Sequence, residues 1–388
     1  YERRTRTMDP AQAQVMPVTA GDVRAEERTA GRASVSVRLL RIGWWVVRFA
    51  LALLLFVGAL QLMKTGAAAL DILQHKGALV KNPGATLGLG WIGALFVLSG
   101  SPMAASALTL VAAGSIDEIQ GFTMLTGSRL GAAFVVLVVA VIYAIRGGRG
   151  ERVKPVSTAV MALSTTALIY IPSAFIGFAL LRGPLRGLDI TFGGSFADII
   201  DLIYGGMLAR VETWPPGVVF LGGLGVLLLT FKLIDSIMPA LDEGTIAGRR
   251  LSWVTRKWPM FALGSLVALI TMSVSVALTV LVPLVAKRYV KRDDILPYIM
   301  GANITTLGDT MLAAFALGSA AAVRIVLAEV IATTILSVVI LLFFYDPVRR
   351  VIWRFQREMV RSKPRLAAFS AALFATPVAV IVASNLLV

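Results

Sequence analysis

The chain has no cysteine and a single histidine, His75, among its 388 residues. Without cysteine, disulfides and thiolate chemistry are excluded, and one imidazole cannot build a metal site from histidines. Acidic residues are few and unclustered, so the sequence shows no catalytic constellation of nucleophile, base and acid. We therefore expect neither an enzyme nor a protein with a bound metal or cofactor.

Charged residues of both signs are scarce. They make up 15% of the chain, whereas hydrophobic residues make up 57% and the mean hydropathy is +0.81, far from a soluble globular average. This composition predicts an all-α integral membrane protein. Apolar runs long enough to cross a hydrocarbon core of ~30 Å occur at 43–63, 122–145, 155–181, 217–234, 295–319, 322–344 and 366–387.

The charge that is present is mainly positive, with a formal net charge of +15. Basic residues gather where apolar runs end, at 146–154, 249–257, 287–292 and 349–365. Cytoplasmic loops of membrane proteins carry such an excess. The charge therefore predicts orientation and contact with anionic membrane lipid, not with nucleic acid. We expect a multi-pass protein of the cell membrane with a cytoplasmic N-terminus.

Two short motifs recur at one fixed spacing. Leu-Ser-Gly-Ser at 98–101 returns as Met-Ser-Val-Ser at 272–275, and Thr-Gly-Ser-Arg-Leu at 126–130 returns as Met-Gly-Ala-Asn-Ile at 300–304, each 174 positions later. Segments rich in alanine, valine and leucine share several residues by chance. Coincident Ser-x-Ser pairs and glycines at one offset nevertheless favour a duplication. A duplicated membrane segment with a polar break at mid-depth is typical of secondary transporters.

The positions of the basic segments also predict the topology. With a cytoplasmic N-terminus and a basic segment after 122–145, the run 87–113 cannot cross once, and Ser-Gly-Ser-Pro interrupts it. The same reasoning applies, with the sides reversed, to 259–286. We therefore predict inverted-topology repeats, each with a re-entrant helical hairpin, giving about seven spans plus two hairpins whose tips lie close together near the midplane.

The predicted segments follow from this topology, and the final helix leaves the C-terminus outside. They are a disordered basic cytoplasmic tail at 1–41, transmembrane repeat 1 at 42–181, an extracytoplasmic loop at 182–214, transmembrane repeat 2 at 215–345, and a basic cytoplasmic segment with a terminal helix at 346–388.

Each predicted hairpin tip frees backbone groups from helical hydrogen bonding and carries two serine hydroxyls. Helix N-termini attract anions, whereas free carbonyls and hydroxyls at helix C-termini suit a hard cation such as Na⁺. The alternative is that the small residues only allow close helix packing. The equivalent placement of the two tips favours a binding site.

The chain resembles the type II sodium/phosphate cotransporters, whose repeats each carry a Gln-Ser-Ser-Ser hairpin followed by Gly-Ala/Ser-Asn-Ile-Gly-Thr-Thr. Here Gly-Ala-Asn-Ile at 301–304 is followed directly by two threonines, and the resemblance covers most of 45–345. The departures are specific. The family glutamines fall on Leu98 and Met272, the middle serines are replaced by glycine and valine, and Arg129 stands at the first asparagine position.

The resemblance, together with the chemistry of the side chains, implies a site with two parts. The expected substrate-binding residues are Ser99, Gly100, Ser101, Ser273, Ser275, Arg129 and Asn303. The expected cation-binding residues are Thr305, Thr306 and Asp309, with Na⁺ as the coupling ion and no other cofactor.

Three ionisable side chains fall inside apolar runs, where each is costly unless it faces a cavity or a partner. Arg129 could hold an oxyanion through two parallel hydrogen bonds, or it could form a structural ion pair with Asp309. Asp309 could also bind Na⁺ or a proton. Glu329 is expected to pair with Arg324, five residues earlier on the same helix.

These features together predict a secondary active transporter of a small anion, with phosphate as the first candidate and Na⁺ coupling, working by alternating access at two opposed hairpin tips. The alternative is a non-transporting membrane scaffold, or a relative whose coupling site has degraded. A membrane enzyme ranks third. The sequence leaves the oligomeric state open.

Overall fold

The computed structural model describes residues 20–68, 79–146, 153–190, 194–237, 256–286, 290 and 294–387. Within these ranges every regular element is a helix. The chain divides into two units, Tyr1–Leu51 and Ala52–Val388. The expected basic segments at 146–154, 249–257 and 287–292 lie largely outside the described residues, as does His75.

The first unit contains the beginning of α1 (Ala20–Ala68). Its Trp45 and Phe49 rings stack with their centroids 5.7 Å apart. The disorder expected for 1–41 is wrong for 20–41, which are helical. Alanine, glutamate and arginine are frequent in this stretch and are strong helix formers, so they extend the apolar helix in the N-terminal direction.

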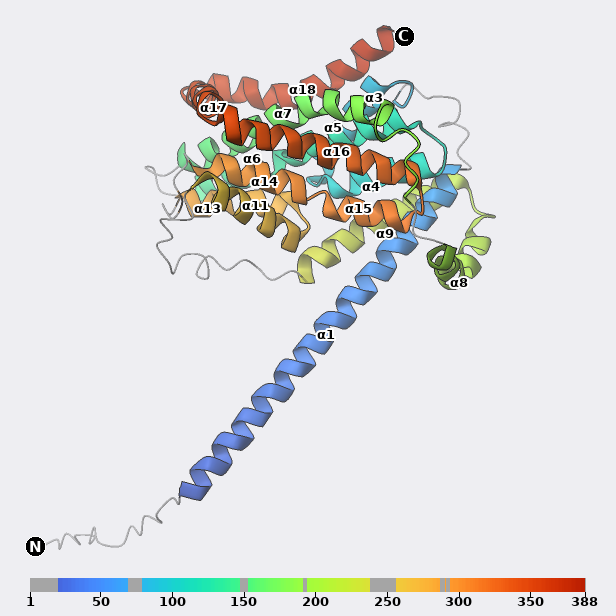
Figure 1. The fold of residues 1–388 in the computed structure, drawn as a ribbon, viewed down its shortest axis with the longest axis vertical. Helices are drawn as coiled ribbons and strands as arrows, with labels where there is room; N and C mark the ends of the chain where they lie inside the picture. Colours follow the sequence, from blue (N-terminus) through green and yellow to red (C-terminus); the bar gives the residue numbers. More distant parts are fainter. Residues whose placement is uncertain are drawn as a thin grey trace, which may run out of the picture. The chain divides into compact units, whose positions relative to one another are not determined.

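The second unit is a set of helices packed side by side, and α14 and α15 follow one another beneath α16 (Figure 1). Besides the end of α1, its elements are α3 (Pro83–Val97), α4 (Ser101–Ala112), α5 (Glu118–Ala132), α6 (Phe134–Arg146), α7 (Val153–Arg182), α8 (Gly194–Val211), α9 (Pro216–Ile237), α11 (Lys257–Thr271), α12 (Val274–Thr279), α13 (Leu281–Ala286), α14 (Ile295–Thr305), α15 (Gly308–Ala316), α16 (Ala320–Val339), the π-helical η3 (Ile340–Phe344), α17 (Tyr345–Val360) and α18 (Lys363–Leu386).

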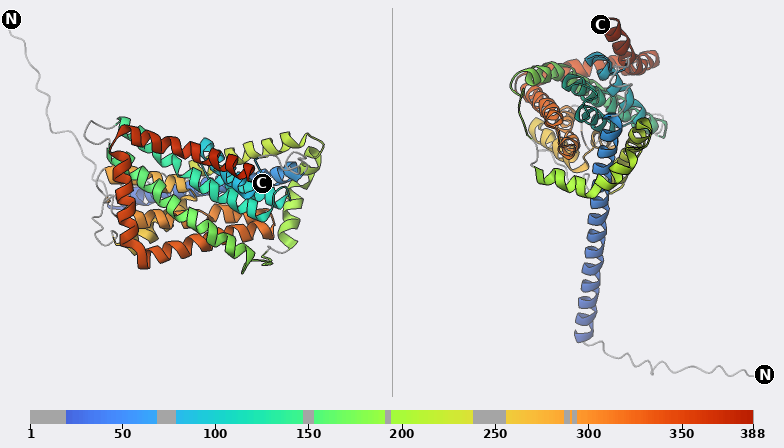
Figure 2. Two further views of the ribbon diagram at one scale, coloured as in Figure 1. Left: turned by 90° about the horizontal axis from the view of Figure 1, so that it is seen from above. Right: turned by 90° about the vertical axis from the view of Figure 1, so that its right-hand side faces the viewer.

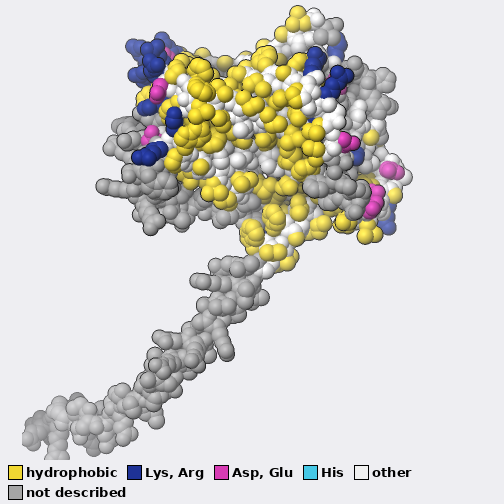
Figure 3. All heavy atoms as spheres, in the orientation of Figure 1, with side chains coloured by type: hydrophobic (Ala, Val, Ile, Leu, Met, Phe, Trp, Pro, Cys, Tyr) yellow, Lys and Arg dark blue, Asp and Glu magenta, His cyan; other side chains and the backbone are white. Residues whose placement is uncertain are grey.

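Six helical stretches are long and apolar enough to cross a membrane, which is compatible with a membrane protein. They are Gly43–Ala68, Glu118–Arg146, Pro155–Arg182, Pro216–Ile234, Ala320–Val360 and Lys363–Leu386. On the face seen in Figure 3, hydrophobic side chains cover the middle of the second unit, and lysine and arginine lie near its margins. One of the seven predicted spans, 295–319, is not one continuous helix. It is divided between Thr305 and Gly308, beside polar residues that bond to other helices.

Two further segments differ from the expectation. The predicted loop 182–214 contains α8, an apolar-rich helix whose Tyr204 hydroxyl donates to the Leu54 carbonyl at 2.7 Å. The predicted basic segment after 345 is α17, which runs across the ends of α16 and α18 (Figure 2). Alternating arginines and apolar residues make α17 amphipathic, and this pattern suits a helix at the edge of an apolar body.

The interruptions predicted in 87–113 and 259–286 are present. α3 ends at Val97 and is followed by Leu98 with φ 56°, and α11 ends at Thr271 and is followed by Met272 with φ 47°. Among the described residues these are the only non-glycine positions with positive φ. They lie 174 positions apart, the same offset as the repeated motifs.

The helices that flank the two breaks also make equivalent contacts. A Cβ on Gly90 would lie 2.0 Å from the Met124 carbonyl oxygen, and a Cβ on Gly264 would lie 2.0 Å from that of Tyr298. Gly127 and Gly301 approach the Leu87 and Phe261 carbonyls in the same way. α3 therefore crosses α5 at backbone contact, and α11 crosses α14 at the equivalent place.

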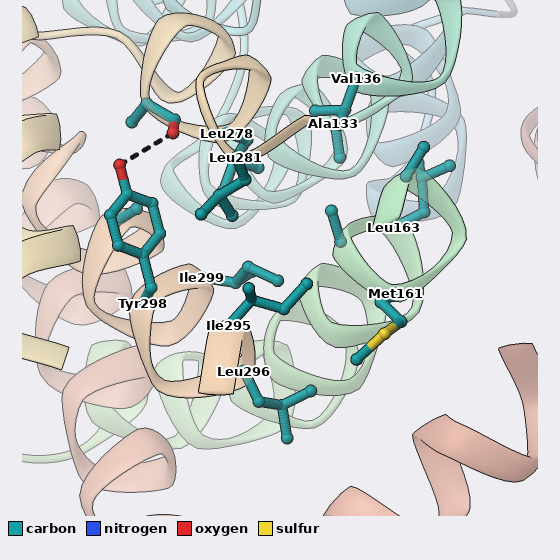
Figure 4. Packing of buried hydrophobic residues seen from close by; sticks show 14 of the residues in the cluster. Ala133, Val136, Met161, Leu163, Leu278, Leu281, Ile295, Leu296, Tyr298 and Ile299 are labelled. Carbon is teal, nitrogen blue, oxygen red and sulfur yellow. Dashed lines mark hydrogen bonds between the residues drawn. The ribbon is translucent and has the colours of Figure 1, made fainter. Parts of the chain in front are cut away.

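Around the second crossing lies an apolar core built from α6, α7, α12, α13 and α14 (Figure 4). The Tyr298 hydroxyl donates to the Ala277 carbonyl at 2.9 Å, which satisfies the one polar atom of this side chain. Leu278, Leu281 and Ile299 pack beside it and are fully buried. This core holds the short helix α12 in place immediately after the second break.

We predict that Gly90→Ala and Gly264→Ala each destabilise the fold by about 1–3 kcal/mol or more, because the added methyl meets a backbone carbonyl that cannot move without shifting a helix. Gly225→Ala is the matched control, since a Cβ there meets nothing within 4 Å. Thermal unfolding in detergent should show a clear loss for the first two variants and none for the control. Equal melting temperatures in all three would contradict the close crossings.

Candidate functional site

The two breaks lie next to each other. The Ser275 hydroxyl, in the first turn of α12, donates to the Leu98 carbonyl at the end of α3 at 3.4 Å. The contact joins residues from the two repeated motifs, as expected for apposed tips. Leu98 and Met272 hold a left-handed conformation that costs a side chain roughly 1–2 kcal/mol. The surrounding packing must therefore hold both breaks in place.

The predicted serines have different surroundings. Ser101 begins α4 and is 7% exposed, and Gly100 packs against the Ser128 carbonyl and the Ala132 methyl of α5. Ser273 caps α12 by accepting a hydrogen bond from the Val276 amide at 3.3 Å. Ser99, between the first helix pair, is half-buried. No side chain caps the N-terminus of α4, so its first amides remain available to another acceptor.

Arg129 directly follows Ser128 on α5 and is 2% exposed. Its Nη2 is 3.7 Å from Asp309 Oδ1, and it donates to the Thr310 hydroxyl, which in turn donates to the same Oδ1 at 2.8 Å. Its Nη1 donates to Thr306 Oγ1 at 3.4 Å. Arg129 and Asp309 therefore form a buried pair, linked through a threonine, between α5 and α15.

Glu329 does not pair with Arg324, so that expectation is wrong. Arg324 Nε instead donates to Glu118 Oε1 at 2.9 Å. Glu329 is fully buried, with Oε2 3.0 Å from Thr126 Oγ1. Helix periodicity explains the difference, because residues five apart do not share a face as residues four apart do. Glu329 thus points toward α5, where it contacts Thr126.

Asn303 and Thr305 of the Gly-Ala-Asn-Ile-Thr-Thr motif face two different helices, α7 and α11. Asn303 Nδ2 donates to Thr166 Oγ1 at 3.2 Å, and the Tyr170 hydroxyl donates to the Asn303 carbonyl at 2.7 Å, so this residue faces α7. Thr305 donates to the Ser265 carbonyl at 2.7 Å and faces α11. Of the three expected cation ligands, Thr306 and Asp309 lie beside Arg129 and Thr305 does not.

Four buried polar atoms in this region have no hydrogen-bond partner within the described part of the chain. They are Arg129 Nε, Asn303 Oδ1, Asp309 Oδ2 and Glu329 Oε1. Buried polar atoms are normally paired, so such a group calls for a water, an ion or a ligand. The four atoms are three oxygen acceptors and one guanidinium donor, and they come from four helices, α5, α14, α15 and α16. The described residues contain no group of three histidine, cysteine or acidic side chains placed to hold a metal ion.

Sequence reasoning missed several members of this polar centre. Thr126, Thr310 and Tyr170 were not expected to take part, and Glu329 was expected to pair with Arg324. The available signal was the burial cost of a carboxylate inside the run 322–344. A threonine three residues before Arg129 on the same helix was a second signal, because residues three apart lie on one face.

No protein-family model, curated protein or solved structure matches the chain. Its function therefore has to be inferred from its own residues.

We predict that Arg129→Met and Asp309→Asn behave as a coupled pair. Arg129→Met leaves a buried carboxylate without its cation and should destabilise the fold by about 3–5 kcal/mol. The double variant should recover much of that loss, because it leaves no unpaired charge. Thermal unfolding of both single variants and the double variant gives the coupling energy. Additive effects would show that the two side chains do not depend on each other.

Proposed function

We propose that the protein is a secondary active transporter of a small anion, with phosphate as the first candidate, and a divergent relative of the type II sodium/phosphate cotransporters. In this proposal the two broken segments are re-entrant hairpins in inverted repeats. The observation that carries it is the contact between the two breaks, where the Ser275 hydroxyl donates to the Leu98 carbonyl.

The equivalent contacts at one offset support the repeat. Leu98 and Met272 share an unusual backbone conformation, and Gly90 and Gly264 share a backbone crossing. The hairpin is supported by the Gln120 side chain, which donates to the Val80 carbonyl at 2.9 Å. The start of α5 therefore lies beside the chain that enters α3, so the chain turns back between them.

The inversion is supported by contacts at the two ends of α16. Near its start, Arg324 bonds to Glu118 at the start of α5. Just beyond its other end, the Leu341 carbonyl accepts from Lys257 Nζ, at the start of α11, at 2.9 Å. These two points are separated by roughly 25 Å of helix at 1.5 Å per residue. The broken segments that contain α3 and α11 thus start toward opposite ends of the same helix, which supports an inverted arrangement.

The chemistry of the centre favours an anion. Arg129 is a fixed cation that binds phosphate or carboxylate in a bidentate way, and its Nε has no partner among the described residues. An incoming anion would compete with Asp309, which Arg129 contacts at 3.7 Å. Asp309 and Thr306 would then be free to hold a cation, and the resemblance favours Na⁺.

A membrane scaffold remains the second candidate, and one observation favours it. Arg129 already has three partners in the protein, Thr306, Thr310 and Asp309, so its charge can be purely structural. A transporter and a scaffold differ in their response to anions. In a transporter an anion would separate Arg129 from Asp309, whereas in a scaffold the pair would stay together.

Uptake into proteoliposomes tests the proposal directly. With a panel of labelled anions, with and without Na⁺ or a pH gradient, we expect accumulation of at least one anion. Ser101→Ala combined with Ser275→Ala should reduce it, because both hydroxyls lie at the breaks. Ser370→Ala on α18 is the matched control, since its hydroxyl bonds only to the Leu366 carbonyl of its own helix. Failure of every anion to accumulate would favour the scaffold.

A further inference from the structure

Glu329 is a buried carboxyl group that the pairing of Arg129 with Asp309 leaves out. It is 0% exposed, its Oε1 has no partner among the described residues, and its Oε2 contacts one hydroxyl, that of Thr126. Asp309, by contrast, has a guanidinium and a hydroxyl beside it. A buried carboxylate with a single neutral partner is costly in an apolar body, whereas a neutral carboxylic acid is not.

The hydrogen bonds around Thr126 fit the neutral acid. Thr126 Oγ1 lies 3.0 Å from Glu329 Oε2 and also 3.0 Å from the Phe122 carbonyl. A hydroxyl has one hydrogen, so it cannot donate to both oxygens at once. If the acid carries the proton on Oε2, it donates to Oγ1, and Thr126 donates to Phe122. Each of the two 3.0 Å contacts of Thr126 Oγ1 is then a hydrogen bond with a hydrogen atom of its own.

The charged and titratable groups that face Glu329 come from three helices. Thr126 of α5 contacts the Glu329 carboxyl directly, and Arg129 lies about one helical turn beyond Thr126 on the same helix. Tyr170 of α7 donates its hydroxyl to the Asn303 carbonyl. Asp309 comes from α15. Of the other helices packed against α16, α4 carries no titratable residue, and Tyr298 of α14 bonds to Ala277 instead. Among the described residues around Glu329, Arg129 is thus the one cation that could compensate a negative charge on the Glu329 carboxylate.

A partly exposed ion pair lies at the end of the bundle where α5 and α16 begin. Glu118 and Arg324, which are 29% and 18% exposed, form an ion pair there between the starts of α5 and α16. Thr126 and Glu329 follow along the same two helices, and Arg129 lies three residues beyond Thr126. From Arg324 to Glu329 the helix rises only about 7–8 Å. A proton from water at this end has a short way to travel.

We propose that Glu329 is a proton-binding site and that the proton it takes up is co-transported with the anion. The proposal rests on the proposed transport function for its second half but not for its first. The proton is taken from water at the Glu118 end of the bundle and is held on the Glu329 carboxyl. It is released as the carboxylate forms again.

Arg129 couples the two ligands. While Arg129 pairs with Asp309, its charge also lowers the cost of an ionised Glu329. An anion that binds Arg129 neutralises that charge, so Glu329 then holds a proton more tightly. Because coupling between two ligands is reciprocal, protonation of Glu329 strengthens anion binding to the same degree. Anion and proton therefore bind together, which is the requirement for symport.

The proton site is tested without transport by infrared spectroscopy of the purified protein in the carboxylic C=O stretching region. We expect a band at neutral pH that shifts in deuterated water. It should be absent in Glu329→Gln and retained in Glu358→Gln, a control at an exposed acid on α17. Glutamine keeps the shape of the neutral acid, so Glu329→Gln should unfold at nearly the wild-type temperature. Lack of a band that depends on Glu329 overturns the proton site.

Coupling is tested in proteoliposomes with the anion that shows uptake. A pH gradient, acid outside relative to the lumen, should drive accumulation by the wild type and by Glu358→Gln. Glu329→Gln should lose this stimulation while it unfolds at nearly the wild-type temperature, because it behaves as a permanently protonated site. Persistence of the stimulation in Glu329→Gln overturns the coupling. If no anion is transported at all, the proposed function and the coupling fail together, and the infrared band alone decides whether the proton site exists.

Discussion

The constraint on which the rest of this structure depends is that a backbone surrounded by apolar side chains must keep its hydrogen bonds, or break them only where protein or water can pair the freed groups. Leu98 and Met272 are two such places, and each ends a helix in a conformation that side chains avoid. They persist because the glycine crossings bring α3 against α5 and α11 against α14 at backbone distance. The same crossings place the breaks against each other, so the tight packing of small residues and the site have one cause.

The second level of organisation is the buried charge. The described core buries one cation, Arg129, and two carboxyl groups, Asp309 and Glu329, and burial makes each charge costly alone. Asp309 contacts Arg129 and Thr310, whereas the contact of the Glu329 carboxyl is with the Thr126 hydroxyl. The ion pair of Arg129 and Asp309 therefore does not account for the second acid, and this supports a role for Glu329 in the proposed function.

The sequence was informative where a local pattern has a local consequence. Ser-x-Ser motifs with glycine and proline nearby predicted both helix breaks, and the pairing of an arginine with an aspartate inside apolar runs was one of the two alternatives that the sequence left open. It failed where the partner is set by packing between distant helices. Nothing local distinguishes Glu118 from Glu329 as the partner of Arg324, because that choice depends on how α5 and α16 lie together. The division of 295–319 was missed for the same reason, since an apolar run gives no sign of a broken helix whose polar residues bond to α5 and α11.

The two repeats differ most at the position where their motifs correspond. Arg129 and Asn303 are 174 residues apart, yet Arg129 reaches across to α14 and α15, whereas Asn303 turns to Thr166 and Tyr170 of α7. A symmetric site would place the same side chains on both sides of the breaks, and both sides would make equivalent contacts with a ligand. Arg129 comes from the first motif, on α5, and the aspartate that it contacts comes from α15. In the proposed function, an anion that binds Arg129 would lie beside α5, and its arrival would weaken the contact between α5 and α15.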